Sequence, residues 1–159
     1  MTRFMGATGL WHFDAHFHNV LTDGERLFIT DFGLASSARF ELSGAEVRFL
    51  EEHALHDGCY VVTELVNWVV TAMSEAGRQG WAHPRVRNDF VRRCAEGQEI
   101  PELPPQAAAI VRRYAPVAVV VNDFYFTLHG ESRKTPYPKN EIDRACAVIG
   151  FHPISRALL

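Results

Sequence analysis

The chain has 159 residues, of which 47% are hydrophobic and 22% charged, and its formal net charge at pH 7 is −3. This length can bury a substantial core, so we expect one domain over residues 1–159. The acidic balance argues against nucleic acid as a partner, because phosphate binding favours a basic surface. The longest apolar run, Ala115–Val121, is too short to cross a bilayer, so no membrane partner is expected.

The cysteines favour a cytoplasmic location. Cys59, Cys94 and Cys146 are odd in number and widely spaced, and they contain no C-x-x-C pair. This usage is typical of reduced thiols and not of a disulfide framework.

Residues 19–30 predict a β-hairpin. The runs Asn19–Thr22 and Leu27–Thr30 are mostly apolar and are separated by Asp23–Arg26. The separator begins with Asp-Gly, a strong hairpin signal, because glycine accepts the positive φ of a tight turn. Pairing of the two runs would bring Asn19, at the start of one strand, close to Asp31, at the end of the other. Met1–Leu10, upstream, is expected to be a poorly ordered lead-in or the end of an interrupted helix.

The rest of the chain predicts helices, so the fold class expected is α+β and mostly α. A capping box at Ser43 and Glu46 starts the first helix, whose Val47 and Leu50 should be buried. Apolar residues recur at three- and four-residue steps through the second helix, which indicates deep burial. The expected helices span residues 44–56, 57–76, 85–96, 106–114, 117–128 and 141–149.

Prolines and polar residues are expected to set the boundaries of the later helices. Gly77–His83 and Gly97–Pro105 should be loops, and Pro116 should kink or restart a helix. Asn140 is the expected cap of the last helix. Of the apolar residues in 85–96, those expected to face inward are Val86, Phe90 and Val91.

One stretch near the start of the chain carries a pattern with a chemical meaning. His12, Asp14 and Asn19 have the spacing H-x-D-x-x-x-x-N, and Asp31-Phe32-Gly33 follows after one hairpin. The two patterns, in this order, resemble the catalytic loop and the metal-binding turn of the protein kinase-like superfamily. The resemblance implies a kinase-like C-terminal lobe and a phosphotransferase that moves the γ-phosphate of ATP to a hydroxyl group.

The resemblance also implies a role for each residue of the two motifs. Asp14 would orient the acceptor hydroxyl and take its proton, and His12 would pack beneath the loop as a scaffold. Asn19 and Asp31 would hold Mg²⁺, a hard cation that prefers oxygen ligands. The residues implied to bind the cofactors ATP and Mg²⁺ are Asn19, Asp31, Phe32 and Gly33.

The acceptor stays open between a protein and a small molecule. Two residues after the loop Asp, eukaryotic-type protein kinases usually have Lys, whereas this chain has His16. A His there is common in the aminoglycoside phosphotransferase and choline kinase branch, which makes His16 a third candidate catalytic residue. That branch, however, seldom has Phe-Gly after its metal Asp. Asp57, at the start of the second helix, is either the carboxylate that anchors the loop in kinases or a helix cap.

The resemblance covers a catalytic lobe without its ATP-grasping lobe, since Met1–Leu10 contains no G-x-G-x-x-G. Three explanations are open: a start codon placed too late, a split enzyme completed by another chain, or a degenerate remnant. The expected partners are a chain that carries the missing lobe, or a second copy bound through exposed apolar surface. The alternative function is that of a non-catalytic pseudokinase that binds a partner.

The histidines support a further alternative, in which His12, His16 and His18 form a metal site with Asp14. Asp14-Ala15-His16-Phe17-His18 resembles the D-x-H-x-H strand end of amidohydrolase and TatD-type nuclease barrels, where two His bind a catalytic metal. A (β/α)₈ barrel needs about 200 residues or more, and the chain lacks the alternating pattern of strands and helices. His53 and His56, on a helix, are expected to be solvated or to cap it.

Overall fold

The computed structural model describes residues 1–81, 83–99, 101 and 103–152. The chain is α+β and mostly helical, as the sequence predicts, and its strands form small antiparallel pairs. It separates into two compact units, the first containing residues 1–61 and His152 and the second residues 62–151. Within the described residues, no helix has both the length and the apolar character needed to cross a membrane.

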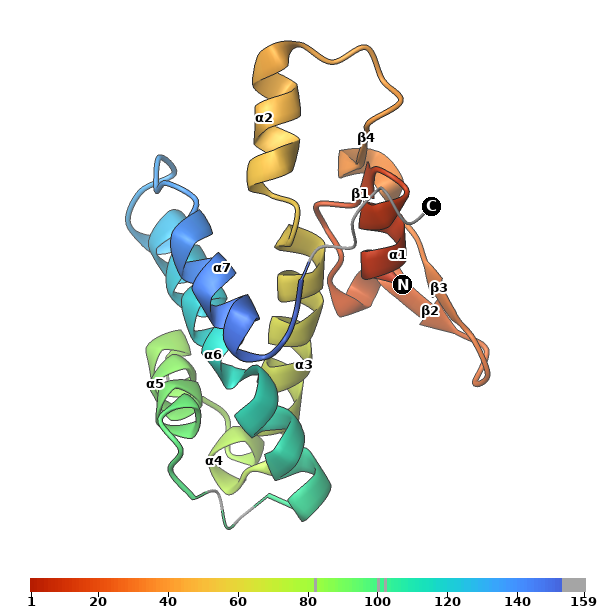
Figure 1. The fold of residues 1–159 in the computed structure, drawn as a ribbon. Coiled ribbons are helices and arrows are strands. Elements are labelled where there is room, and N and C mark those ends of the chain that lie inside the picture. The colour runs from red at the N-terminus through yellow and green to blue at the C-terminus, as the bar shows by residue number, and fades with distance from the viewer. Residues whose placement is uncertain (82, 100, 102, 153–159) are drawn as a thin grey trace. The chain divides into compact units, whose positions relative to one another are not determined.

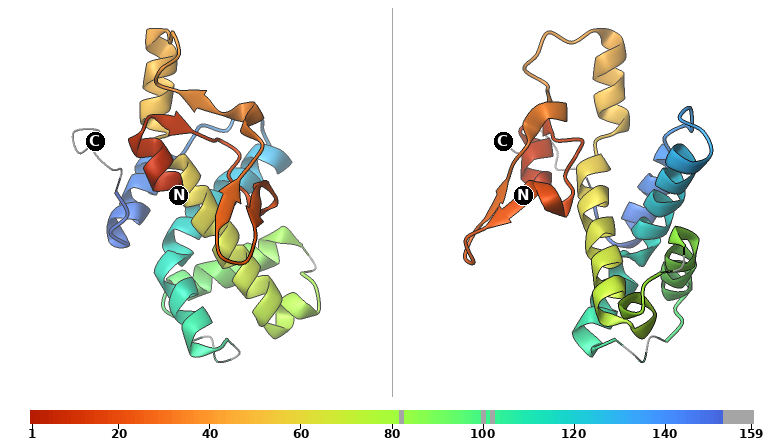
Figure 2. Two further views of the ribbon diagram at one scale, coloured as in Figure 1. Left: turned by 90° about the vertical axis from the view of Figure 1, so that its right-hand side faces the viewer. Right: turned by 180° about the vertical axis from the view of Figure 1, so that it is seen from behind.

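The first unit holds all of the strands in the described part of the chain (Figure 1). Two of them form the expected hairpin, which both views of Figure 2 display. In its register Val20 lies opposite Ile29, and Thr22 lies opposite Leu27. The elements are α1 (Thr2–Ala7), β1 (Leu10–Trp11), β2 (Val20–Thr22), β3 (Leu27–Ile29), β4 (Ser36–Ser37), α2 (Gly44–Glu52) and the start of α3 (His56–Met73).

The hairpin turn has the chemistry that the sequence indicates. Gly24 adopts a φ of +95°, and the Asp23 carboxylate accepts hydrogen bonds from the backbone N–H groups of Glu25 and Arg26. An aspartate that bonds to its own turn in this way stabilises the reversal of the chain. The prediction of a hairpin here is confirmed.

A second strand pair, β1 with β4, is not foreseen by the sequence. Leu10 lies opposite Ser37 and Trp11 opposite Ser36. Strands of two residues contain no alternation to detect, so sequence patterns cannot reveal them. The pair joins the chain just before His12 to the chain just after the turn at Asp31. Where a disordered lead-in or the end of a helix was expected, α1 forms over Thr2–Ala7.

The second unit is built on helices that pack around α6 (Figure 1). Helices α5 and α7 both lie against α6. The elements are the remainder of α3, α4 (Glu75–Arg78), α5 (Pro84–Ala95), α6 (Pro105–Gly130) and α7 (Lys139–Val148). Six α-helices, α2 to α7, thus follow the hairpin in the described part of the chain.

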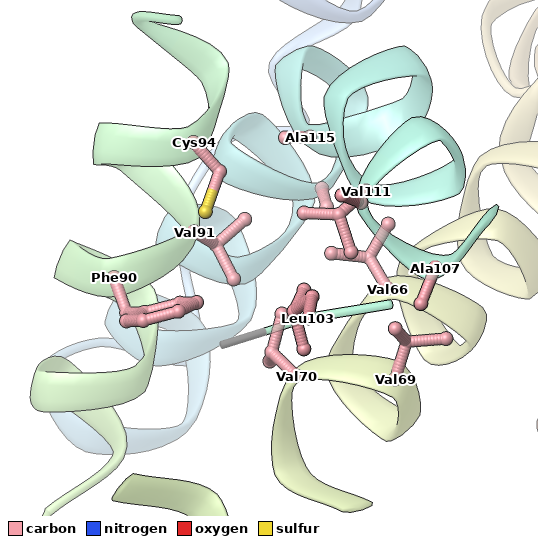
Figure 3. Close-up of a cluster of buried hydrophobic side chains, with 12 residues drawn as sticks. Val66, Val69, Val70, Phe90, Val91, Cys94, Leu103, Ala107, Val111 and Ala115 are labelled. Atoms are coloured by element: carbon pink, nitrogen blue, oxygen red, sulfur yellow. The ribbon is translucent and has the colours of Figure 1, made fainter. Parts of the chain in front are cut away.

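The core of the second unit brings together side chains from α3, α5 and α6 (Figure 3). Val66 and Val70 of α3 meet Val91 of α5 and Val111 of α6, and all four are fully buried. Phe90 and Val91 face inward as expected. Val86 on the same helix is 47% exposed, and Val47 of α2 is 41% exposed, so the burial expected for these two valines is wrong.

Helix α6 runs unbroken from Pro105 to Gly130, with Pro116 in its interior. Of the two outcomes expected at Pro116, a kink or a restart of the helix, the restart is therefore wrong. Proline removes one backbone donor from a helix. Ala115 and Val117, on either side of it, are fully buried, so tertiary packing offsets this local penalty.

Other helix ends also differ from the expectation. Helix α7 starts at Lys139 with Pro138 at its N-cap, so Asn140 lies inside the first turn and is not the cap. Helix α4 occupies part of the loop expected from Gly77, because the Ser74 hydroxyl accepts the N–H of Gly77 and starts a new turn. The capping box of Ser43 and Glu46 is confirmed, although α2 ends at Glu52 and not at His56.

Candidate functional site

His12 lies at the centre of the candidate site and is fully buried. Its Nε2 lies 2.9 Å from the carbonyl oxygen of Thr30, and its Nδ1 accepts the backbone N–H of Asp14 at 3.3 Å. The neutral ring with its proton on Nε2 satisfies both contacts, because one nitrogen then donates and the other accepts. His12 thereby joins the loop that carries Asp14 to the residue that precedes Asp31.

Asp57, in the first turn of α3, fastens the same loop from the other side. Its carboxylate accepts the backbone N–H of His12 at 2.6 Å and that of Phe13 at 2.8 Å. Asp57 is 5% exposed, so these charge-assisted bonds form away from water. The interpretation of Asp57 as the anchor of the loop is confirmed, and the alternative of a simple helix cap does not describe its contacts.

Asn19 holds Asp14 in place. The Asn19 side-chain nitrogen donates to the carbonyl oxygen of Asp14 at 2.9 Å and to Oδ2 of its carboxylate at 3.1 Å. Within the described residues, no hydrogen bond reaches the side-chain oxygen of Asn19, so that oxygen remains available as a ligand. Asp14 is only partly buried, so its carboxylate is accessible to solvent.

The turn at Asp31 is set close to this loop. The backbone N–H of Thr30 donates to the carbonyl oxygen of Asn19 at 2.9 Å, directly before Asp31. Asp31 is exposed and adopts a φ of +58°, a conformation that Asp tolerates better than most residues. Its Oδ1 accepts the N–H of Gly33 at 3.3 Å. The Phe32 and His12 rings meet in a T-shaped arrangement, with 4.9 Å between their centroids.

Gly33 fits this turn because it has no side chain. A Cβ atom at this position would lie 3.2 Å from Oδ1 of Asp31, closer than most real contacts of that kind. A larger residue would therefore displace the Asp31 carboxylate from its present position.

His16 and His18 differ in their surroundings. Nε2 of His16 lies 3.4 Å from Oδ1 of Asp14, which forms an ion pair when His16 is protonated. His18 is exposed, and its ring centroid lies 5.6 Å from that of His16. Hydrogen bonds therefore link His12, Asp14 and Asn19 to one another and to the backbone before Asp31, while His18 stays at the edge.

Two residues near the site were missed or misread from the sequence. Thr30 offers its carbonyl oxygen to His12, and both its backbone N–H and its hydroxyl donate to the carbonyl oxygen of Asn19. A single Thr at the end of an apolar run does not reveal these contacts in the sequence. His56 was expected to be solvated or capping, yet its ring packs against the Phe13 ring at a centroid distance of 5.6 Å. Burial lowers the pKa of His56 from its ordinary value. His53 does act as expected, because it is the C-cap of α2 and its ring contacts the carbonyl oxygen of Phe49 at 2.7 Å.

The hydrolase alternative finds no support in the described part of the chain. There, no three His, Cys, Asp or Glu side chains are grouped so that they could hold a metal ion. Both ring nitrogens of His12 are engaged by backbone groups. The paired strands are antiparallel, whereas the barrel that carries the D-x-H-x-H motif has parallel strands.

Comparison with protein-family models, with curated proteins and with solved structures gives no match for this chain. Its function is therefore inferred from the geometry of the site.

Proposed function

We propose that this chain is the catalytic lobe of a kinase-like phosphotransferase that moves the γ-phosphate of ATP to a hydroxyl group of a protein or a small molecule. The contact between His12 Nε2 and the Thr30 carbonyl oxygen carries this proposal. It joins the loop of the candidate base, Asp14, to the turn of the candidate metal ligand, Asp31. Phosphoryl transfer depends mainly on positioning and charge neutralisation, so a rigid connection between these two groups is the feature it requires.

Asp14 is the group proposed to meet the acceptor. Its carboxylate is oriented by the Asn19 amide and remains partly exposed. It would accept a hydrogen bond from the acceptor hydroxyl and take its proton as that oxygen bonds to the γ-phosphorus of ATP, while the bond from this phosphorus to the bridging oxygen breaks and ADP leaves. A carboxylate suffices for this step, because orienting the nucleophile matters more than basicity in such transfers.

Asn19 and Asp31 are the residues proposed to hold Mg²⁺. Their donor set fits that cation, because it combines an amide oxygen without a described hydrogen-bond partner with an exposed carboxylate. When bound with ATP, Mg²⁺ neutralises negative charge on the phosphates. A hydrogen bond from the backbone N–H of Gly33 orients the Asp31 carboxylate.

His16 is proposed as a second catalytic group beside Asp14. Its Nε2 approaches Asp14 Oδ1 at 3.4 Å, so a protonated ring would place a positive charge next to the proposed base. Within the described residues, its other nitrogen is buried without a hydrogen-bond partner. A cation at this position would offset charge on the transferred group.

The exposed apolar side chains of the first unit support a partner that carries the ATP-grasping lobe. Leu21 and Phe28 lie opposite each other in the hairpin and are both exposed, so they form an apolar pair on one face. Others nearby in sequence are Leu27, Phe32 and Leu34. In the absence of that partner, this surface should promote self-association, which sedimentation at increasing concentration would detect. A monomer at all concentrations would argue against this part of the proposal.

The proposed function is tested by adding ATP and Mg²⁺ to the chain and monitoring the NMR chemical shifts of its backbone amides. This measurement also detects weak complexes. The informative variant is Asp31→Asn, because Asn tolerates the positive φ while removing the charge. The matched control is Asp23→Asn, which removes the same charge from the exposed hairpin turn. We expect Mg²⁺-dependent shifts at Asn19 and Asp31, and an affinity about tenfold lower in Asp31→Asn only, or ~1.4 kcal/mol.

Two other outcomes would change the conclusion. Absence of any Mg²⁺-dependent shift in the folded chain, alone and with added ATP-grasping partner, would favour the pseudokinase alternative. Equal losses in Asp31→Asn and Asp23→Asn would mean that net charge, and not the site, governs binding. If ATP binds, an acceptor screen should then show phosphotransfer in the wild type and at least a hundredfold less in Asp14→Asn.

A further inference from the structure

Phe13, which lies between His12 and Asp14, has an uncommon backbone conformation. It follows the buried His12 and precedes the proposed base Asp14, and its φ is +62°. This left-handed region is disfavoured for a residue with a bulky side chain. Such a conformation persists only where surrounding contacts determine it.

The first turn of α3 holds the backbone of Phe13 by both of its polar groups. The N–H of Phe13 is donated to the Asp57 carboxylate at 2.8 Å. The His56 ring is also hydrogen-bonded to the backbone of Phe13. This hydrogen bond raises the pKa of His56, so the imidazole donates and the carbonyl oxygen of Phe13 accepts. That carbonyl belongs to the peptide bond that connects Phe13 to Asp14.

The Phe13 side chain is held by aromatic contacts on the same side. Its ring lies 5.5 Å from Phe49, 6.2 Å from His53 and 5.6 Å from His56, measured between centroids. His56 in turn contacts Tyr60 at 5.9 Å. The side chain and the carbonyl group of Phe13 therefore share one contact residue, His56.

The groups that face His56 keep it neutral near pH 7. Burial lowers its pKa most strongly, Asp57 beside it on α3 raises it, His53 at the end of α2 lowers it, and the carbonyl of Phe13 raises it. Tyr60 on α3 completes the surroundings with a ring contact. A neutral imidazole has one N–H, and here that donor is directed to the loop.

We propose that His56 is a positioning residue for Asp14, which fixes the Phe13–Asp14 peptide through its hydrogen bond to the Phe13 carbonyl oxygen. This inference rests on the proposed role of Asp14 as the group that meets the acceptor hydroxyl. His56 completes a clamp in which Asp57 binds the N–H and His56 binds the carbonyl of the same residue. Loss of the clamp on one side lets the peptide rotate and moves the Asp14 carboxylate away from its contact with Asn19.

Amide hydrogen exchange in the segment Trp11–Asn19 tests the clamp without any need for activity. His56→Phe keeps a ring but removes the donor, whereas His56→Gln keeps a donor. We expect the Asp14 amide to exchange about tenfold faster in His56→Phe, and His56→Gln to restore most of the protection. The control is His129→Phe, an exposed histidine of α6, which should leave this segment unchanged.

Three results would overturn the proposal. They are wild-type exchange at Asp14 in His56→Phe, equally fast exchange in both His56 variants, and a matching increase in His129→Phe. If His56→Phe does not fold, His56→Met replaces it, because Met matches the length of Gln without a donor. Phosphotransfer by the wild type is measured separately, and its absence counts against the proposed function and not against the clamp. Where transfer is found, His56→Phe should lower kcat about tenfold with an unchanged KM for ATP, and His56→Gln should recover most of it.

Discussion

Asn67 of α3 and Asn122 of α6 exchange two hydrogen bonds inside the second unit. The nitrogen of Asn67 donates to the oxygen of Asn122 at 2.9 Å, and the nitrogen of Asn122 donates to the oxygen of Asn67 at 3.0 Å. Both residues are buried, so the pairing satisfies polar groups that would otherwise be costly to remove from water. It also fixes which turn of α3 lies against which turn of α6.

Replacement of one member of this pair should cost more than replacement of both. Asn122→Leu leaves the Asn67 amide buried without its partner, so we expect the free energy of unfolding to fall by about 1–3 kcal/mol. In the double variant with Asn67→Leu, no polar group is left unpaired, and the loss should be smaller than the sum of the single losses by about 1–2 kcal/mol. Urea denaturation of the four proteins measures this coupling. Additive losses would mean that the two amides do not act together.

Asp57→Asn should destabilise the first unit. An amide can offer only one acceptor oxygen to the two N–H groups that the carboxylate now binds, so one of the N–H groups of His12 and Phe13 loses its partner. The expected loss is about 2 kcal/mol. Urea denaturation should show it, with Asp89→Asn on the exposed face of α5 as a control that changes stability by less than about 0.5 kcal/mol. Equal stability of the two variants would contradict the anchoring role.

Gly77→Ala should be strongly destabilising although alanine favours helices. A Cβ atom at Gly77 would lie 2.3 Å from the carbonyl oxygen of Thr71, which is backbone and cannot move aside cheaply. We expect a loss of about 2 kcal/mol or more in thermal and chemical unfolding. Gly130→Ala at the end of α6 is the matched control, because nothing lies within 4 Å of its Cβ position. That variant should be neutral or more stable by up to about 1 kcal/mol.

Stability should decrease below pH 6.5 through His56. Burial lowers the pKa of His56 in the folded chain, so the unfolded chain binds more protons between that pKa and 6.5. The free energy of unfolding therefore rises with pH across this window, and the full contribution of His56 is present above it. That contribution is about 1.4 kcal/mol for each unit by which the pKa is lowered. Urea unfolding between pH 5 and 8 should show a shallower slope in His56→Gln than in the wild type. If the free energy of unfolding changed with pH equally in both proteins, His56 would have the same pKa in the folded and the unfolded chain.

Local signals in the sequence were sufficient for the hairpin, the first cap and the proximity of Asp14 to Asn19. The Asp23-Gly24 pair predicts the turn, and Ser43 with Glu46 predicts the start of α2, because each depends on residues a few positions apart. The spacing of Asp14 and Asn19 likewise brings them together, since their hydrogen bonds form within one loop.

The missed features depend on distant parts of the chain. The helix through Pro116 exists because burial of its neighbours outweighs the local penalty, and that burial is decided by other helices. The position of Phe13 is fixed by residues more than forty positions later, in α3. No sequence window around Phe13 contains the cause of its positive φ.

The pairing of Trp11 with Ser36 has a consequence for how the chain acquires its structure. It closes residues 12–35 into a loop, and the β2–β3 hairpin divides that loop into shorter closures. The entropy lost on closing a loop grows only slowly with its length, and short closures form fastest. The segment with Asp14 and Asp31 can therefore form early in folding from its own contacts. Its hydrogen bonds to Asp57 form later, when α3 packs against it. A probe attached at Glu25, at the exposed tip of the hairpin, would report that order of events in real time.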